Sequence, residues 1–404
     1  EQRVVADRAL ARRHTGDIQA LQAERDTLWT ERLAFIRNLP TTMVMEEMPT
    51  PRQAYVLTRG NYDAHGEKAD PGMPEQLIAP WPKDAPRNRL GLARWFLQPQ
   101  HPLTARVVVN RFWAQLFGVG LAKSVEDFGT QGEWPSHPEV LDILARDFVD
   151  GGWDVKKLFR NIVLSSTYRQ TSDASPTLYA RDPENRLLAR GPRVRLTSEQ
   201  IRDQALALSG LLAEKIGGPS VRPYQPEGLY KGIVVDAPYP STTWELGKGD
   251  ELYRRSLYTF WKRTVPHPAM LTFDSPDREF CSARRSRTNT PLQALVLWNE
   301  TGYLESSRKL AERMLKDGGA DDAARTSFAF RLATGRAPRP AETEVLVRTL
   351  AQLRADFSAR PDDAAKLVKV GASVPDPTLP AVELAAAAGV ANLILTLDET
   401  ITKN

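Results

Sequence analysis

Apolar residues recur at spacings of three and four through most of the chain, and this periodicity constrains the fold more than any other feature. In LTARVVVNRFWAQLFG, Val108, Phe112, Leu116 and Phe117 share one helical face before Gly118 ends the run. Comparable helical patterns occupy PEVLDILARDFVDGGW, EQIRDQALALSGLL, TPLQALVLWNETGYLESSRKLAERML and AVELAAAAGVANLILTL. We therefore expect a mainly α fold: a multi-helix globular domain with one principal core and long irregular loops.

Signals for β-structure are few. AYVLTRG, residues 54–60, reads as a short strand that ends at a glycine, and a stretch rich in proline and glycine follows it. RRSLYTFWKRTV, residues 254–265, alternates well enough for a second strand, although a helix is also compatible with it. Residues 219–250 lack periodicity and predict a long loop. The β element is expected to be small.

Local signals place several helix boundaries. Ser136, Pro138 and Glu139 have the order of a capping hydroxyl, an early proline and a capping-box acid, so we expect Ser136 to cap a helix. Asp154 is placed to cap the next helix. Two later segments are expected to form a helical hairpin across RAPR, and residues 357–378 a mobile connector.

The N-terminal residues differ from the rest. Residues 1–37 mix Leu21, Leu28, Leu33 and Ile36 with dense charge, which predicts a long surface helix or a coiled-coil arm. We therefore predict that residues 1–40 form an arm or a junction to an upstream region, and that residues 41–404 form the main helical domain.

Composition excludes several classes. The net charge of +4 offers little general attraction for phosphate, so nucleic acid is not an expected partner. No apolar run approaches the roughly 20 residues that span a bilayer. Cys281 is the single cysteine, which rules out an internal disulfide, a zinc knuckle or a haem attachment motif within this chain. We expect Cys281 to be a small packed side chain, with a reactive thiol as the alternative.

Four blocks of sequence together resemble a known family. They are HPLTARVVVNRFWAQLFGVGLAKSVEDFGTQGEWPSHPEVLD, RRSLYTFWKRTVPHPAMLTFDSPDRE, RTNTPLQALVLWNE and NLILTLDETIT. In this order they are similar to domain of unknown function 1553, the C-terminal domain of planctomycete-type secreted cytochrome proteins. The resemblance runs from about residue 40 to the end of the chain.

The resemblance carries implications that the residues alone do not. It implies an exported multidomain parent, periplasmic or extracellular, of which this chain is a C-terminal piece. In that family the domain usually follows a haem-binding cytochrome c module and a second uncharacterised domain. Since no haem attachment motif occurs in this chain, haem c is expected only in such an upstream domain.

The first group of candidate site residues surrounds DFGTQGEWPSHPE, the 127–139 loop. Its ligand-binding candidates are Arg106, Asn110, Arg111 and Gln131, and its candidates for proton transfer are Asp127 and His137. A structural interpretation, in which Arg106 pairs with Asp127 to hold the loop, competes with a ligand-binding interpretation.

The second group lies in residues 254–293, the Arg-rich segment. Its ligand-binding candidates are Arg254, Arg255, Tyr258, Trp261, Arg263 and Arg278, and Asp277 is a third catalytic candidate. Arginine forks suit carboxylates, sulfates or phosphates, whereas aromatic faces suit sugar rings. The competing interpretation is a structural network of Arg and Asp that holds an irregular loop.

Motifs for specific chemistry are sparse. Asp127 with Glu133, or Asp274 with Asp277, could act as paired carboxylates in glycoside cleavage, which depends on a separation that sequence does not supply. The five histidines do not form a zinc motif, so no metal is predicted. Whether the chain is an enzyme is left open.

Our hypothesis is that the two groups meet at one loop-lined cleft that binds or processes a glycan-derived or anionic ligand. The alternative is a non-catalytic assembly module that docks an upstream cytochrome c domain or a surface partner.

Overall fold

We describe a computed structural model of the chain, which describes residues 15–39, 41–73, 79–229 and 244–403. The structure is 51% helical with few short strands, which confirms the expected mainly α class. It divides into two units, residues 1–73 and 74–404, and each is described by itself. A boundary at residue 40 stays a prediction.

The first unit contains one long helix and a hairpin. Helix α2 (Thr15–Asn38) agrees with the expected arm over its described part, and residues 1–14 lie outside the described residues. Strand β1 (Ala54–Leu57) is confirmed, and it pairs with an antiparallel strand β2 (His65–Ala69) across the 3₁₀ turn η1 (Thr58–Gly60). Strand β2 was not predicted, because its sequence HGEKA is polar and has no β-branched residue.

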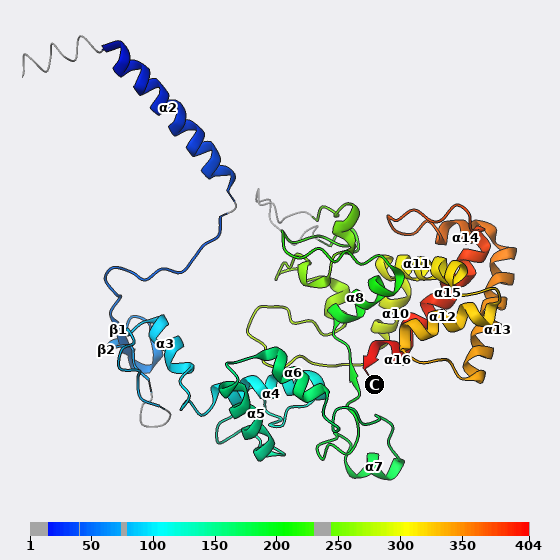
Figure 1. Cartoon of the computed structure of the whole chain (residues 1–404), viewed down its shortest axis with the longest axis horizontal. Helices are drawn as coiled ribbons and strands as arrows, with labels where there is room; N and C mark the ends of the chain where they lie inside the picture. The colour runs from blue at the N-terminus through cyan, green and yellow to red at the C-terminus, as the bar shows by residue number, and fades with distance from the viewer. Residues whose placement is uncertain (1–14, 40, 74–78, 230–243, 404) are drawn as a thin grey trace, which may run out of the picture. The chain divides into compact units, whose positions relative to one another are not determined.

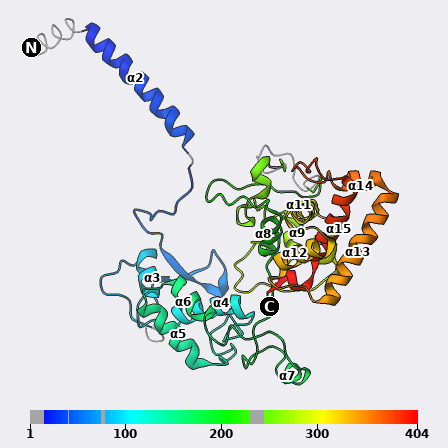
Figure 2. The same ribbon diagram turned by 45° about the vertical axis from the view of Figure 1, so that its right-hand side comes forward.

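The second unit holds most of the helices, which Figures 1 and 2 show from two directions. Its α-helices are α3 (Arg89–Phe96), α4 (Thr104–Phe117), α5 (Pro138–Asp150), α6 (Val155–Val163), α7 (Pro176–Arg181), α8 (Ser198–Ser209), α9 (Pro268–Thr272), α10 (Pro291–Asn299), α11 (Thr301–Asp317), α12 (Asp322–Thr334), α13 (Pro340–Ala359), α14 (Pro361–Leu367), α15 (Ala381–Thr396) and α16 (Asp398–Ile401). Its 3₁₀ helices are η2 (Gly249–Tyr253) and η3 (Ser256–Tyr258), and its strands β3 (Val194–Arg195) and β4 (Thr402–Lys403) pair antiparallel.

Helix α15 lies at the centre of the principal core, packed against α11, α13 and α14. Ala385, Ala386 and Ala387 are completely buried and, as consecutive residues, point to different sides of this helix, as expected for a helix that is apolar all round. A Cβ on Gly389 would lie 2.6 Å from the Leu353 Cδ1 atom, so a larger residue here would require the Leu353 side chain of α13 to shift. This packing fixes α11 in the bundle.

A second apolar cluster joins α4, α5 and α6, and it includes Val109, Trp113, Leu141 and Ile162. Trp113 stacks on Phe117 with a centroid distance of 4.1 Å. The structure therefore has a second, smaller apolar cluster in addition to the one principal core that was predicted.

Three local predictions are wrong. Residues 254–265 form no strand. They contain the short helix η3 and pair with residues 213–221 only through two isolated bridges, Ala213 with Arg254 and Val221 with Thr259. Residues 357–378 contain helix α14 and a hydrogen-bonded loop instead of a mobile connector. Ser136 does not cap α5, because its Oγ donates to the Leu121 carbonyl and His137 occupies the N-cap position.

Replacing Ala386 by leucine is expected to destabilise the unit by about 1–3 kcal/mol, because a completely buried helix contact has no room for three more carbons. The urea unfolding midpoint measures this loss. The matched control is Ala351→Leu on the exposed side of α13, which should change stability by no more than about 0.5 kcal/mol. Equal effects of the two changes would contradict the central role of α15.

Candidate functional site

A pocket lies between α8, α9 and α11, and we call it the α8–α11 pocket. Its empty volume, counted out to its open mouth, is about 500 Å³. Apolar lining comes from residues such as Ala205, Leu252 and Met270. The polar lining residues are Ser198, Arg202, Tyr224, Tyr253, His267, Glu300, Tyr303, Glu305 and Ser306. A mostly apolar pocket with a few polar groups is the usual form of a small-molecule site.

Glu305 on α11 is the most buried charged group of this pocket, with 1% of its side chain exposed. Its Oε1 atom accepts hydrogen bonds from the Tyr253 hydroxyl at 2.9 Å and from the Ser373 N–H and Oγ at 2.6 Å each. Its Oε2 atom has no hydrogen-bond partner among the described residues. A Cβ on Gly371 would lie 2.2 Å from the Glu305 Cδ atom, so the loop can approach this carboxylate only at a glycine.

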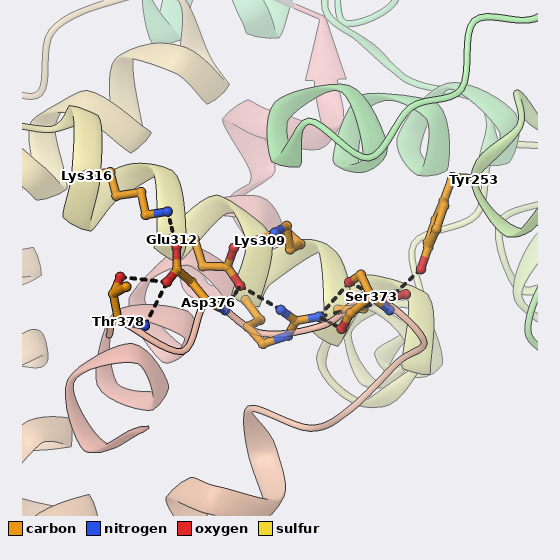
Figure 3. A network of polar contacts seen from close by, with 9 residues as sticks. Tyr253, Lys309, Glu312, Lys316, Ser373, Asp376 and Thr378 are labelled. Carbon is orange, nitrogen blue, oxygen red and sulfur yellow. Dashed lines mark hydrogen bonds and ion pairs between the residues drawn. The ribbon is translucent and has the colours of Figure 1, made fainter. Parts of the chain in front are cut away.

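Buried charges continue from Glu305 along α11. Arg308 donates to Glu312 at 2.7 Å and to both Ser373 oxygens at 2.6 and 2.7 Å. Beyond it, Glu312 contacts the Asp376 N–H, and Asp376 pairs with Lys316. Figure 3 shows how these contacts tie the 371–378 loop to α11. Moving the loop away would leave the buried charges of α11 without these partners, which is energetically costly, so the network holds the loop in place.

His267 enters the pocket from the N-cap position of α9 and is 4% exposed. Its Nε2 atom lies 2.8 Å from the Tyr224 carbonyl oxygen. Since a carbonyl only accepts, Nε2 carries the proton and Nδ1 has a free lone pair. Nδ1 has no partner among the described residues. Burial lowers the pKa of His267 to about 4, so the ring is neutral near pH 7.

The one arginine of the lining is already bonded. Arg202 donates to the carbonyls of Arg254 at 2.9 Å and Leu252 at 2.6 Å, and to the Ser256 Oγ at 3.2 Å. The Glu300 carboxylate caps α11 by accepting from the N–H groups of Gly302 and Tyr303. Burial raises the pKa of the Glu300 carboxyl, against the opposing effect of this capping.

Tyrosine rings provide much of the remaining wall. Burial, followed by the charge of Glu305, raises the pKa of Tyr224, and burial with the Glu305 hydrogen bond raises that of Tyr253. Burial and then the Glu300 charge raise the pKa of Tyr303. All three phenols therefore stay neutral. The lining residues thus include three tyrosines, and three others, Glu305, His267 and Ser306, each carry a buried polar atom without a partner among the described residues: Oε2, Nδ1 and Oγ.

In the 127–139 loop, the predicted pair of Arg106 with Asp127 is wrong. Arg106 donates to Asp142 on α5 at 2.6 Å, whereas Asp127 accepts from the Gly129 N–H at 2.7 Å within the loop. Asn110 is completely buried and binds both the N–H and the carbonyl of Ala122 at 2.9 Å. Asn110 thus fixes the chain that leads into the loop.

The other candidates of this group lie nearer the surface. The Nδ1 atom of His137 is 3.0 Å from the Ser136 Oγ, and Arg111 and Gln131 are exposed. Their role in binding or catalysis stays a prediction.

In the Arg-rich segment, the cation and ring candidates pair with each other. Arg254 is 4% exposed, donates to the carbonyls of Lys215, Gly217 and Pro219, and lies 3.7 Å above the Tyr258 ring centroid. Arg278 lies 4.6 Å above the Trp261 ring centroid. These groups are therefore already engaged within the protein.

The remaining candidates of this segment are polar surface groups. Asp277 accepts from Trp261 through its carbonyl and from the Glu279 N–H through its side chain, while Arg255 and Arg263 are exposed. Asp274 is bonded to Arg195 and Thr288. A role in ligand binding stays a prediction for this group too.

Residues that neighbour the two predicted groups are in contact: Arg284 lies 3.5 Å from Glu126, and Arg287 donates to the Gly118 carbonyl. None of the candidate residues belongs to the lining of the α8–α11 pocket. Cys281 is exposed, so its expected packed environment is wrong. No group of His, Cys, Asp or Glu suited to a metal ion occurs among the described residues, and no described helix is long and apolar enough to cross a membrane.

Glu305 and the buried charges next to it on α11 were not predicted from the sequence, for a physical reason. Glu305, Arg308 and Glu312 follow helical spacing and resemble the ion pairs of a solvated face. Their burial depends on the distant 371–378 loop. The signal that could have drawn attention is a dense polar run beside the apolar positions Leu304, Leu310 and Ala311.

The pH dependence of stability should reveal His267. Its pKa lies below the unfolded value of 6.5, so the unfolded chain binds a proton first as pH falls. Stability is therefore lost between about pH 6.5 and 4. In His267→Gln, the stability difference between these pH values should shrink by roughly 3 kcal/mol, as measured by urea unfolding. The control is His137→Gln outside the pocket, and an unchanged pH profile in His267→Gln would refute the assignment.

Comparison with known proteins adds the family. No curated protein and no solved structure matches the chain. A family model described as PSD1, protein of unknown function (DUF1553), matches residues 88–350, which is more than half of the chain and includes α3 through α12 and the first part of α13. The chain therefore belongs to the DUF1553 family, whose function is unknown.

Proposed function

We propose that the protein binds a small polyhydroxylated, glycan-derived ligand in the α8–α11 pocket. One observation carries the proposal: Glu305 Oε2, His267 Nδ1 and Ser306 Oγ are buried, unpartnered polar atoms of residues that line one pocket. Buried polar groups in proteins normally have hydrogen-bond partners, and leaving one without a partner costs about 1–3 kcal/mol. Ligand hydroxyl groups would supply those partners.

The composition of the wall supports a polyol over an anion. Arg202 has its terminal nitrogens bonded to protein oxygens, so it offers little to a carboxylate or sulfate. Glu300 and Glu305 further disfavour negative charge. The rings of Tyr224, Tyr253 and Tyr303 offer apolar faces for a sugar ring. The hydroxyl groups of a sugar could donate to the acceptor atoms of the other lining residues. The proposed binding site is therefore the α8–α11 pocket, and not the predicted cleft between the 127–139 loop and the Arg-rich segment.

The setting of the protein is a separate proposal that rests on the family resemblance alone. We propose an exported protein whose parent carries a cytochrome c module upstream. The proposed function concerns binding, and a catalytic role for Asp127, His137 or Asp277 stays a prediction.

A thermal-shift screen tests the pocket. Neutral sugars at millimolar concentration should raise the unfolding temperature, because a ligand that binds the native state stabilises it by mass action. Ser306→Ala should weaken the affinity by about 3- to 10-fold, the worth of one hydrogen bond, without destabilising the free protein, since this hydroxyl has no partner to lose.

Asp127→Asn is the matched variant for the 127–139 loop. It should leave sugar binding intact. If Asp127→Asn abolishes binding while Ser306→Ala does not, the site lies at that loop and not in the pocket.

Helix α2 favours a second function, the assembly module. Leu21, Leu28 and Phe35 are spaced by seven residues, share one face, and are 64%, 57% and 67% exposed. Trp29, beside them, is 56% exposed. An exposed apolar stripe of this kind is typical of a surface that packs against another protein.

The assembly function predicts association through this stripe. The purified chain, alone and mixed with a soluble c-type cytochrome, should show complexes by light scattering, and Leu28→Glu with Phe35→Glu should dissolve them because buried charge is costly. Thr30→Glu on the opposite face is the control. A chain that stays monomeric and leaves the cytochrome unbound argues against assembly through α2.

A further inference from the structure

The α8–α11 pocket has a deficit of hydrogen-bond donors and of positive charge. Among its unpartnered atoms, Glu305 Oε2 and His267 Nδ1 are acceptors, and the Ser306 hydroxyl can also accept. Glu300 and Glu305 are its two carboxylates, against the single cation of Arg202. Because Arg202 donates to Leu252, Arg254 and Ser256, its charge is directed at the backbone around η2.

Glu305 itself is incompletely neutralised. Its nearest cation is Arg308, whose Nη2 lies 3.9 Å from Oε1, beyond hydrogen-bond range. The Arg308 fork is instead used by Glu312 and Ser373. Oε1 is surrounded by three donors, whereas Oε2 has none among the described residues. A buried carboxylate oxygen without a donor is unfavourable unless a ligand or water supplies one.

The neighbouring groups suit the same ligand chemistry. The neutral His267 ring presents a lone pair and does not repel a cation. Tyr224, Tyr253 and Tyr303 contribute aromatic rings to the lining, and the electron-rich faces of such rings attract cations. Carboxylate, imidazole lone pair and hydroxyl can each accept one N–H of an ammonium group.

Resting on the proposed function, we propose that the ligand of this pocket carries a protonated primary amine, an amino sugar, whose ammonium group donates to Glu305 Oε2. This assignment goes beyond sugar binding because it names the ammonium group, which distinguishes the proposed ligand from neutral sugars. It also explains why the acceptors are left without protein partners, since an ammonium supplies the donors and the charge together.

Isothermal titration of the whole chain at mildly acidic pH tests the proposal with four sugars: glucosamine, glucose, N-acetylglucosamine and glucuronate. Glucosamine should bind at least about tenfold more tightly than the other three, since a hydrogen bond to a charged group is worth about that factor or more. This result supports the amine assignment.

The other outcomes separate the two proposals. If glucose or N-acetylglucosamine binds as well as glucosamine, the amine assignment fails and sugar binding stands. If glucuronate binds best, the assignment fails and an anionic ligand replaces it. If no sugar binds, ordered water satisfies the three atoms, and both proposals fail.

A variant localises the effect. In Glu305→Gln, the amide oxygen can keep the bonds to Tyr253 and Ser373, while the amide nitrogen replaces the free acceptor Oε2 by a donor. The preference for glucosamine over glucose should disappear. A preference that persists in a folded Glu305→Gln protein overturns the assignment. If this variant does not fold, the four-sugar comparison on the unaltered chain decides.

Discussion

The buried ionic row of Glu305, Arg308 and Glu312 on α11 is the constraint on which this structure depends. Charged groups pay a large cost for leaving water, and the protein offsets it by bringing the 371–378 loop over them. The loop supplies backbone N–H groups, carbonyl oxygens and the Ser373 hydroxyl in place of solvent. The same bonds fix Tyr253, so the row connects the bundle interior to the wall of the pocket.

This row depends in turn on the packing of α15. Small residues on α15 bring the surrounding helices close, and Asn392 on α15 donates to the Ser307 hydroxyl of α11 and to the Leu297 carbonyl. A helix held on one side by apolar contact and on the other by a charged network has little freedom to shift. The pocket is therefore built on a rigid element, and its unpartnered atoms stand out against a wall in which most polar groups are bonded.

The fate of the arginines shows why local composition misleads about binding. Arg254 beside Tyr258 has the chemistry of an anion or sugar site, yet its fork holds three carbonyls of residues 215–219 and its plane covers the tyrosine ring. Arg278 covers Trp261 in the same way. Irregular loops expose many backbone carbonyls, and arginine is the side chain best able to bind several of them at once. The arginines of such a loop thus often stabilise the loop's own structure and do not bind a ligand.

The sequence by itself determined the helices, because their signals are local: the apolar face of α4, the Asp154 cap of α6, the glycine after α4 and the all-apolar character of α15 depend on neighbours within a few residues. It also determined the family, through motifs in a fixed order. Only the tertiary structure decided the candidate site. Glu305 meets Ser373 across 68 positions and Tyr253 across 52, and His267 joins them from a third segment. Whether a polar helical face is solvated or buried depends on which distant segment covers it, and local patterning carries no information about that partner.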